Sequence, residues 1–406
     1  MKIIASAGGR FNAFYQIENL VKFGVLQKFY TTGYSHKLDK NKIPKNLVKN
    51  APIFEYIGRA WKFLPAFVNE RLAWNVVKDN LFDFWVKQEL KKVNDFDLFV
   101  GWCNFSLHSI PVARSKGAKI VLESGSSHIQ EQSDILQKEY AKFGVKFNPV
   151  HEKIRKKVLR EYELADHIMV PSTFVYDSFL KHGIDSKKLI KVPYGVELDR
   201  FFINKKKSDK FRVIFVGMVG IRKGLYYLFK AWEKLNLPID KTELLIVGNI
   251  QPEFKEVLNK FHPSFDRLRM RGRSRRTGRT GKWENIKFCD PSDRNELAKL
   301  YQSSSVFVHP SVEEGLSMVQ AEAMASGLPL ICTTNTGGSD LIEENKHGFV
   351  VPTCDVDALA EKILWCYQNQ NECYEMGLRV QEKIKNQTWQ NYGKNVFAEY
   401  KKILEK

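Results

Sequence analysis

The chain has 406 residues, of which 43% are hydrophobic and 27% charged, and its formal net charge is +18. This length exceeds one typical hydrophobic core, so we expect two domains of roughly 200 residues each. The composition is that of a globular protein, and no apolar run approaches the ~18–20 residues that span a bilayer. The six cysteines lack the paired spacing of a zinc site, which favours free thiols in a reducing compartment such as the cytoplasm.

The first half of the chain alternates apolar strand patterns with helical patterns. Met1–Gly9 is too short and too soon polar for a signal peptide, and it predicts a strand that ends in a glycine turn. A long helical pattern over Phe67–Val93 places Trp74, Leu81 and Trp85 on one face. The predicted strands are Lys2–Ala7, Leu26–Thr31, Asp97–Trp102, Lys119–Glu123, His167–Val170 and Leu189–Val192.

The second half repeats this alternation, which is typical of α/β proteins with doubly wound parallel sheets. Polar residues 204–210 predict a linker between a first domain of residues 1–203 and a second domain of residues 211–385. Residues 386–406 predict a C-terminal helix that packs back on the first domain. The predicted strands are Arg212–Val216, Glu243–Val247, Ile286–Cys289, Val306–Val308, Leu330–Cys332 and Phe349–Val351.

An arginine-rich segment interrupts the second domain between Arg267 and Lys282, with seven arginines and one lysine. The lack of apolar periodicity and the interspersed glycines predict an inserted loop over residues 264–282. Two interpretations stay open, an accessory loop and a nucleic-acid-binding segment, although the basic run lacks the aromatic residues on which bases stack. The remaining positive charge fits acidic lipid headgroups or phosphorylated substrates.

Several turns that follow predicted strands carry polar residues, and ligands of parallel sheets bind at such turns. Gly8 and Gly9 follow the first strand, although two glycines alone are a weak phosphate-binding signal. His128 follows the fourth strand and is expected to face the cleft between the domains. Arg222 and Lys223 precede a helix, where cations are unfavourable unless an anion lies near them. A diphosphate is one such anion, and solvated surface cations are the alternative.

The stretch from Glu314 to Glu322 follows a short apolar strand and opens an amphipathic helix. Two carboxylates eight residues apart lie ~12 Å apart along a helix, about the length of a nucleotide-diphosphate-sugar between its sugar and its ribose. Gly315 permits close backbone approach, and the N–H groups of a first helical turn can bind a diphosphate. The alternative is that both glutamates are ordinary helix-end and surface residues.

Together these segments resemble the retaining glycosyltransferases of family 4, which have two Rossmann-like domains facing across a cleft, the GT-B fold. The resemblance covers nearly the whole chain. Its most specific part is His309–Pro329, which is similar to the proline-serine and E-x7-E signature of that family. Further matches are Val192–Phe201, Glu163–Ser172 and Arg222–Gly224.

The resemblance implies a role for each matched residue. It implies two catalytic residues, Glu314 at the donor sugar and His128 near the same sugar. Glu322 would hydrogen-bond the ribose of the donor. The residues implied to hold or approach the diphosphate are Gly9, Arg222, Lys223, Gly315, Leu316, Ser317 and Met318.

Two positions depart from the family pattern. Met218 stands where many members have an arginine, so Arg222 would replace that charge, and Ser317 stands where a glycine is usual. No Asp-x-Asp pair lies at a suitable turn, so we expect a metal-independent hexosyltransferase with no cofactor beyond its nucleotide-sugar co-substrate. As in the family, the acceptor would attack the sugar on the same face from which the leaving group departs, and this would retain the anomeric configuration.

The acceptor is predicted less closely, as a glycan or lipid-linked hydroxyl in the synthesis of cell-surface polysaccharide or glycolipid. Arg59–Phe67 contains aromatic and basic residues and Lys153–Arg160 is a basic stretch, a combination that suits the inner face of a membrane. Internal packing of the aromatics with a solvated basic helix face is an equal alternative. A sugar-nucleotide epimerase or hydrolase on the same fold also stays open.

Overall fold

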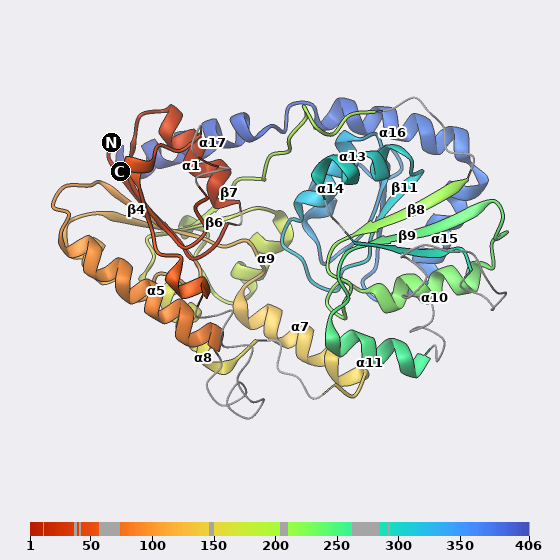
Figure 1. Cartoon of the computed structure of the whole chain (residues 1–406), viewed down its shortest axis with the longest axis horizontal. Coiled ribbons are helices and arrows are strands. Elements are labelled where there is room, and N and C mark those ends of the chain that lie inside the picture. Colours follow the sequence, from red (N-terminus) through yellow and green to blue (C-terminus); the bar gives the residue numbers. More distant parts are fainter. Residues whose placement is uncertain are drawn as a thin grey trace.

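A computed structural model places the chain in two lobes, each built around one parallel β-sheet (Figure 1). It describes residues 1–10, 12–35, 39, 42–56, 74–145, 150–203, 210–261, 284–290 and 293–405. The predicted Arg-rich loop 264–282, linker residues 204–209 and the stretch 59–67 lie outside the described residues. Within the described part, no helix is long and apolar enough to cross a membrane.

The N-terminal sheet has seven strands in the order β3-β2-β1-β4-β5-β6-β7, all of whose pairings are parallel. The order reverses at β1, so the loops after β1 and β4 diverge and leave room for a ligand. The strands are β1 (Ile3–Ala7), β2 (Leu26–Thr31), β3 (Val48–Asn50), β4 (Leu98–Trp102), β5 (Lys119–Glu123), β6 (His167–Val170) and β7 (Leu189–Lys191). The edge strand β3 was not predicted, because its three residues are half-buried or exposed and show no apolar run.

The helices of this lobe include α1 (Ala13–Lys22), α5 (Trp74–Lys91), α6 (Ile110–Ser115), α7 (Ile129–Lys142), α8 (Glu152–Leu164) and α9 (Thr173–Lys181). The face predicted for the helix that contains α5 is wrong at Leu81, which is 46% exposed, whereas Phe82 and Val86 are buried. The segment has apolar residues on opposite sides. The sheet against which it packs therefore decides which side is covered.

The C-terminal sheet has six parallel strands in the order β10-β9-β8-β11-β12-β13. They are β8 (Phe211–Val216), β9 (Thr242–Val247), β10 (Ile286–Cys289), β11 (Val306–His309), β12 (Leu330–Thr333) and β13 (Gly348–Val351). The helices include α10 (Leu225–Leu235), α11 (Pro252–Phe261), α13 (Arg294–Gln302), α14 (Met318–Ala325), α15 (Val356–Gln368) and α16 (Gln370–Ile384). Each predicted strand in both halves is present, with ends that differ by one residue at most.

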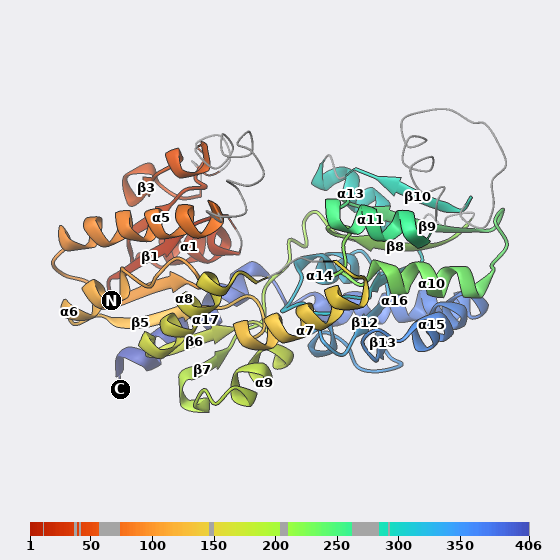
Figure 2. The same ribbon diagram turned by 90° about the horizontal axis from the view of Figure 1, so that it is seen from below.

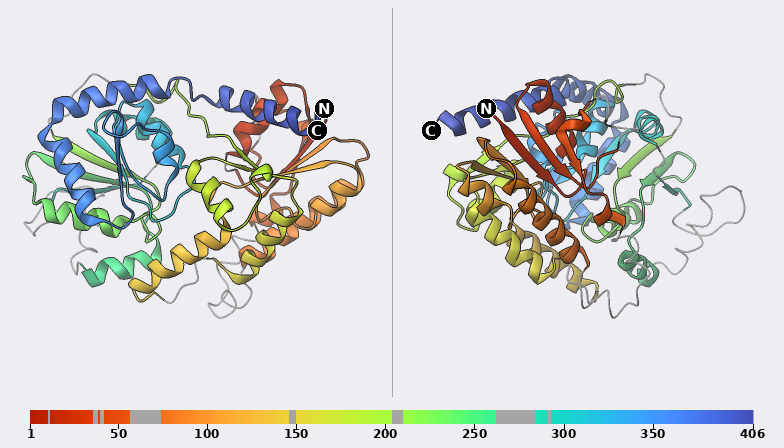
Figure 3. Two further views of the ribbon diagram at one scale, coloured as in Figure 1. Left: turned by 180° about the vertical axis from the view of Figure 1, so that it is seen from behind. Right: turned by 60° about the vertical axis from the view of Figure 1, so that its left-hand side comes forward.

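Two helices join the lobes. The last helix, α17 (Trp389–Glu405), leaves α16 and returns to the N-terminal lobe, where it packs against α1 (Figure 3). Its Tyr392, Val396 and Tyr400 belong to the N-terminal core. In the other direction, α7 starts in the N-terminal lobe and adds Leu136 and Tyr140 to the core of the C-terminal lobe (Figures 1 and 2).

Candidate active site

A charged cluster forms where the loop after β11 meets the loop after β8. Glu314 lies in the first loop, and its Oε2 accepts a hydrogen bond from Arg222 Nη1 at 3.0 Å and another from Lys223 Nζ. Both cations precede α10, so residues 92 and 91 positions apart in sequence meet at the carboxyl end of the C-terminal sheet. The structure thus brings three predicted site residues together.

Burial and pairing set the charge states of this cluster. Burial raises the pKa of the Glu314 carboxyl, but Arg222 and Lys223 outweigh it and lower that pKa to about 2. Burial lowers the pKa of the Lys223 ammonium, against the opposing effect of Glu314. Burial also acts to lower the pKa of Arg222, and here Glu314 and Glu313 prevail and raise it. Glu314 is therefore a carboxylate at neutral pH, with two cations held beside it.

Glu313, which the sequence did not mark, connects this cluster to the N-terminal lobe. Its side chain is fully buried and accepts hydrogen bonds from Ser127 Oγ at 2.7 Å and from Gln132 Nε2 at 3.0 Å. Its Oε2 also lies 3.5 Å from Arg222 Nη1. The E-x7-E spacing points to the neighbouring Glu314 and not to Glu313. The contacts of Glu313 with the N-terminal lobe show that it belongs to the site.

Gly315 allows the two lobes to touch through their backbones. A Cβ atom added there would lie 1.9 Å from the carbonyl oxygen of Gly125. Ser172 Oγ in the N-terminal lobe donates a hydrogen bond of 2.9 Å to the carbonyl oxygen of Gly315. Gly315 was predicted to admit a ligand, and in the structure it admits the backbone of the opposite lobe.

A cavity of about 420 Å³ lies between the lobes beside this contact. The C-terminal lobe contributes Glu314, Leu316, Ser317 and Met318 to its wall, and the N-terminal lobe contributes the turns after β4 and β5. Ser317 is the N-cap of α14 and makes no side-chain cap hydrogen bond. The start of α14 therefore leaves backbone N–H groups without intrahelical partners beside the cavity, as a site for an anion requires.

Glu322 lies in α14, and its carboxylate forms an ion pair with an arginine. Its Oε1 pairs with Nη2 of Arg294. The Nη1 of the same arginine donates a hydrogen bond of 3.0 Å to Tyr15 OH. Arg294 Nη2 also lies 3.4 Å from Glu197 Oε2. Burial raises the pKa of Glu322 in spite of this partner. Arg294 was not predicted as a site residue, because nothing in its local sequence shows that it reaches Glu322.

His128 takes a different position from the one expected. It is the N-cap of α7, where its Nδ1 accepts a hydrogen bond from the Gln130 N–H at 3.3 Å. The ring is buried and stacks on His182 at 4.5 Å, and it is not among the described residues that line the cavity. Burial, with a smaller effect of His182, lowers its pKa to about 4, so the imidazole is neutral. Gly9 also lies off the cavity lining, half-buried in the turn after β1.

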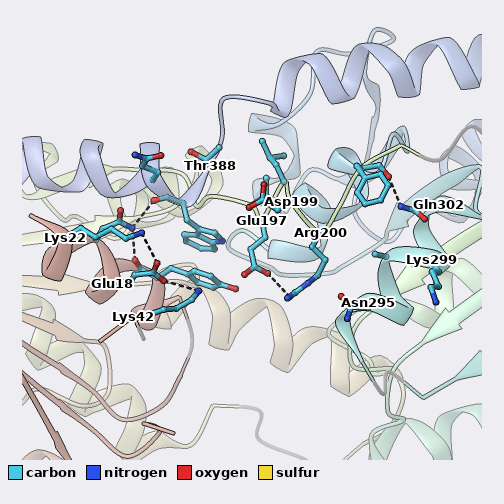
Figure 4. Close-up of a pocket in the computed structure, with 18 residues that line it drawn as sticks. Glu18, Lys22, Lys42, Glu197, Asp199, Arg200, Asn295, Lys299, Gln302 and Thr388 are labelled. Carbon is cyan, nitrogen blue, oxygen red and sulfur yellow. Dashed lines mark hydrogen bonds and ion pairs between the residues drawn. The ribbon is translucent and has the colours of Figure 1, made fainter. Parts of the chain in front are cut away.

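A larger cavity of about 810 Å³ lies between α1, α13 and the start of α17, and residues 196–200 also line it (Figure 4). Its charged groups largely satisfy one another. Glu18 pairs with Lys22 at 2.9 Å and with Lys42 at 3.2 Å, and Glu197 pairs with Arg200 at 3.0 Å. The cluster around Glu314 is separate from it, so we place the candidate site in the smaller cavity.

Across the residues that the structure describes, no group of three or more His, Cys, Asp or Glu side chains could hold a metal ion. The positive charges available at the site are Arg222 and Lys223. Among the described residues around Glu314, these side chains and the start of α14 could bind a diphosphate.

Comparison with known proteins finds a family match over the C-terminal half of the chain. Residues 197–385 match the model of the family described as Glycosyl transferases group 1. Sulfoquinovosyl transferase SQD2 of Arabidopsis thaliana is 24% identical over 243 residues, which cover 56% of this chain and 43% of that protein. Capsular polysaccharide biosynthesis glycosyltransferase CapM of Staphylococcus aureus is 23% identical over 47% of this chain and 48% of that protein. The chain spans about half the length of these relatives.

Solved structures of other proteins superimpose on this chain over nearly its whole length. HepE of Anabaena in complex with UDP superimposes with a TM-score of 0.68 at 14% identity, covering 99% of this chain and 100% of that chain. The sucrose-phosphate synthase of Thermosynechococcus elongatus gives a TM-score of 0.69 at 17% identity and covers all of both chains. The predicted fold class is confirmed: two Rossmann-like parallel-sheet lobes in the arrangement of GT-B glycosyltransferases. The C-terminal half carries the sequence pattern of group 1 glycosyl transferases.

Proposed function

We propose that this chain is a retaining glycosyltransferase of family 4, which moves a hexose from a nucleotide-diphosphate-sugar to a hydroxyl of a glycan or lipid-linked acceptor. The match of residues 197–385 to group 1 glycosyl transferases supports transfer of a sugar. The relative named for capsular polysaccharide biosynthesis supports a part in polysaccharide or glycolipid synthesis. Solved structures of HepE with UDP and with UDP-glucose support a nucleotide-sugar as the donor.

The contact of Glu314 with Arg222 and Lys223 carries this proposal. A half-buried carboxylate beside two cations matches the two charges of the reaction, positive at the sugar ring and negative at the departing diphosphate. In the proposed complex the donor diphosphate lies against Lys223, Arg222 and the first N–H groups of α14. Glu314 faces the sugar. The two cations and the helix amides supply the positive charge, so we propose a reaction that needs no metal.

The proposed reaction takes place on one face of the sugar. The bond between the anomeric carbon and the β-phosphate oxygen breaks, and its electron pair stays on the leaving diphosphate. The acceptor oxygen bonds to the anomeric carbon on the same face, and its proton passes to the departing phosphate oxygen. Glu314 stabilises the positive charge that develops on the ring. Arg222 and Lys223 stabilise the leaving group more strongly as its charge grows, which lowers the barrier.

The ribose of the donor is assigned to Glu322. Because Arg294 occupies this carboxylate in the structure, the bound ribose shares Glu322 with Arg294 or displaces it. Gly9 is proposed to let the turn after β1 approach the diphosphate from the N-terminal lobe.

His128 is assigned a positioning part, because its buried ring caps α7 next to Ser127, the partner of Glu313. His128→Asn keeps a side chain that caps helices well while it removes the imidazole. We expect this variant to keep most of its activity. A loss of more than about a hundredfold, measured as kcat/KM, would instead assign the imidazole to the sugar itself.

Transfer is tested by incubating the protein with UDP-, GDP- and ADP-sugars and following release of the nucleoside diphosphate. A donor at a hundred times its Kd should stabilise the fold by ~2.7 kcal/mol, which a thermal-shift screen detects. NMR of the product then gives the anomer. An inverted product, or full activity in Glu314→Ala, contradicts the proposal, and release of free sugar regardless of acceptor supports a hydrolase instead.

We propose a cytoplasmic protein that can bind the inner face of a membrane. The basic helix α8 offers exposed Lys153, whereas Lys157 is buried and donates to the carbonyl oxygen of Asn104. Arg155 and Arg160 pair with glutamates of the same helix. Co-sedimentation with anionic vesicles that is lost at high salt supports this location. No binding at low salt contradicts it.

A further inference from the structure

The N-terminal wall of the candidate cavity contains a carboxyl group that the proposed chemistry does not use. Glu123 ends β5, is 3% exposed, and lines the cavity opposite Glu314. Its Oε1 accepts hydrogen bonds from Gln16 Nε2 at 2.8 Å and from Tyr400 OH at 3.3 Å. These contacts from α1 and α17 fix the direction of the carboxyl group, and none of the hydrogen bonds given for the described residues uses its Oε2.

Beside Glu123, the turn after β4 is held rigidly in an unusual conformation. Asn104 has a φ of +74°, in the left-handed region that asparagine tolerates better than most residues. Its N–H donates to Glu161 at 2.6 Å, and its Nδ2 donates to Asp79 at 2.6 Å. Lys157 Nζ donates to its carbonyl oxygen at 2.7 Å. Backbone strain at such a turn persists where the surrounding contacts over-determine it, often at a binding site.

The contacts of Asn104 leave one of its polar atoms free. Its Oδ1 is buried and has no hydrogen-bond partner in the described structure, while the residue lines the cavity. A buried acceptor without a partner is unfavourable, and a hydrogen bond from a bound hydroxyl group would relieve this. Glu123 and Asn104 thus present two hydrogen-bond acceptors to one cavity wall.

The N-terminal wall also includes aromatic residues and carries no positive charge. Trp102, Phe105, Tyr162 and Tyr194 line this part of the cavity. Among the described residues of the N-terminal lobe that line the cavity there is no lysine, arginine or histidine, and the one carboxyl group is that of Glu123. Arg222 and Lys223 contact Glu314 on the opposite wall. An anion buried against this N-terminal wall would lose its hydration without gaining a cation from the wall, which is unfavourable.

We propose that this wall is the acceptor subsite and that it takes an uncharged saccharide ring, with Glu123 and Asn104 accepting hydrogen bonds from its hydroxyl groups. The inference rests on the proposed glycosyl transfer, and it restricts the acceptor. The moiety beside the donor sugar bears no phosphate or carboxylate, and any charged or lipid part of the acceptor lies outside the cavity. Aromatic rings pack against the apolar faces of the sugar while the two acceptors select its hydroxyl pattern.

The experiment compares matched acceptors under the donor that the screen identifies. Methyl glycosides of common hexoses form the uncharged set, and the corresponding hexose 6-phosphates and uronic acids form the anionic set. We expect transfer to at least one methyl glycoside, with kcat/KM at least about tenfold above that of its anionic counterparts. Equal or better use of an anionic acceptor overturns the inference, as does turnover of the donor without transfer to any uncharged acceptor.

Variants separate recognition from structure. In Glu123→Gln a neutral amide replaces the carboxyl group, and in Asn104→Gly the free acceptor is lost while a left-handed backbone stays favourable. We expect each to raise the acceptor KM about tenfold and the donor KM much less, with circular dichroism unchanged. Glu163→Gln, on the exposed end of α8, is the matched control and should leave both constants unchanged. If both cavity variants leave the acceptor KM unchanged, the subsite is wrong. If no nucleotide-sugar is turned over, the proposed function itself fails.

Discussion

At the scale of single residues, the candidate site is organised by compensation of charge. Glu314 alone would be costly in its half-buried position, and Lys223, only 7% exposed, would be costly too. Together with Arg222 they form a cluster whose pairing holds the pKa of Glu314 at about 2. The cations that keep Glu314 ionised are the same ones that we assign to the diphosphate. When the donor binds, Arg222 and Lys223 would therefore have two anionic partners, Glu314 and the diphosphate, in place of Glu314 alone.

Lys223→Ala should weaken donor binding and slow transfer, because one of the two cations beside the diphosphate is lost both in the donor complex and in the transition state. A charge-assisted contact contributes about 1.5–3 kcal/mol, so kcat/KM should fall roughly ten- to a hundredfold. Titration calorimetry with the nucleoside diphosphate measures the binding part. Lys234→Ala, an exposed lysine in the last turn of α10, is the control. An unchanged donor affinity would remove Lys223 from the site.

Gly315→Ala should force the lobes apart at the candidate site. The added Cβ would meet the backbone oxygen of Gly125 at 1.9 Å, and backbone cannot move aside as a side chain can. We expect loss of most activity, with each lobe still folded. Gly117→Ala controls for replacing a glycine, because its Cβ meets nothing within 4 Å and only its φ of +84° adds strain of about 1–2 kcal/mol. Equal effects of the two substitutions on kcat/KM would contradict this role for Gly315.

At the scale of elements, α17 completes a lobe that is distant from it in sequence. Its Tyr400 is fully buried in the N-terminal core, and the tyrosine OH reaches Glu123 and Gln16. The N-terminal sheet thus depends on the last residues of the chain. The helix α7 works in the opposite direction, since its Leu136 packs in the C-terminal core. Each lobe contains a helix whose neighbours in sequence lie in the other lobe.

Tyr400→Ala should destabilise the N-terminal lobe by about 3–5 kcal/mol, the usual cost of removing a buried aromatic side chain. The free energy of unfolding, or the midpoint in urea followed by fluorescence, measures this effect. Lys401→Ala, the exposed neighbour in the same helix, should change it by less than about 0.5 kcal/mol. A small effect of Tyr400→Ala would show that α17 can leave the lobe without loss of its core.

At the scale of the whole molecule, stability depends on pH through buried carboxyl groups. Burial raises the pKa of Glu123 from 4.5 to about 7, although Gln16 and Tyr400 oppose it, and burial raises that of Glu161 to about 7 as well. A carboxyl group with a raised pKa in the fold stabilises it at pH values below 4.5, and this contribution is lost as the pH rises through 7. Glu314 behaves oppositely, because its contribution is present above pH 4.5 and is lost as the pH falls through 2.

We therefore expect the melting temperature to fall between pH 5 and pH 8.5. Glu123→Gln should raise the free energy of unfolding at pH 8.5 by up to about 3 kcal/mol, because the neutral amide avoids ionisation of a buried group. Near pH 5 the variant and the parent should agree. Scanning calorimetry at both pH values measures the difference. A gain that is the same at both pH values would contradict ionisation of Glu123 as its cause.

Features that depend on neighbouring residues could be predicted from the sequence. Apolar runs such as Lys119–Glu123 and Ile286–Cys289 predicted the strands, and the turn residues Lys223 and Glu314 were both expected at the donor. This succeeds because carboxyl ends of parallel strands meet on one side, so local order implies proximity. The short exposed strand β3 and the buried face of α5 were not accessible in this way.

Tertiary structure decided the partners that lie far apart in the chain. Glu313 meets Ser127 across 186 positions, and Gln16 meets Tyr400 across 384. The N-cap position of His128, the arginine on Glu322 and the acceptor wall around Glu123 likewise depend on how two lobes and two exchanged helices pack. Local patterns carry no record of such contacts, because burial and desolvation act on a side chain only after distant segments have come together.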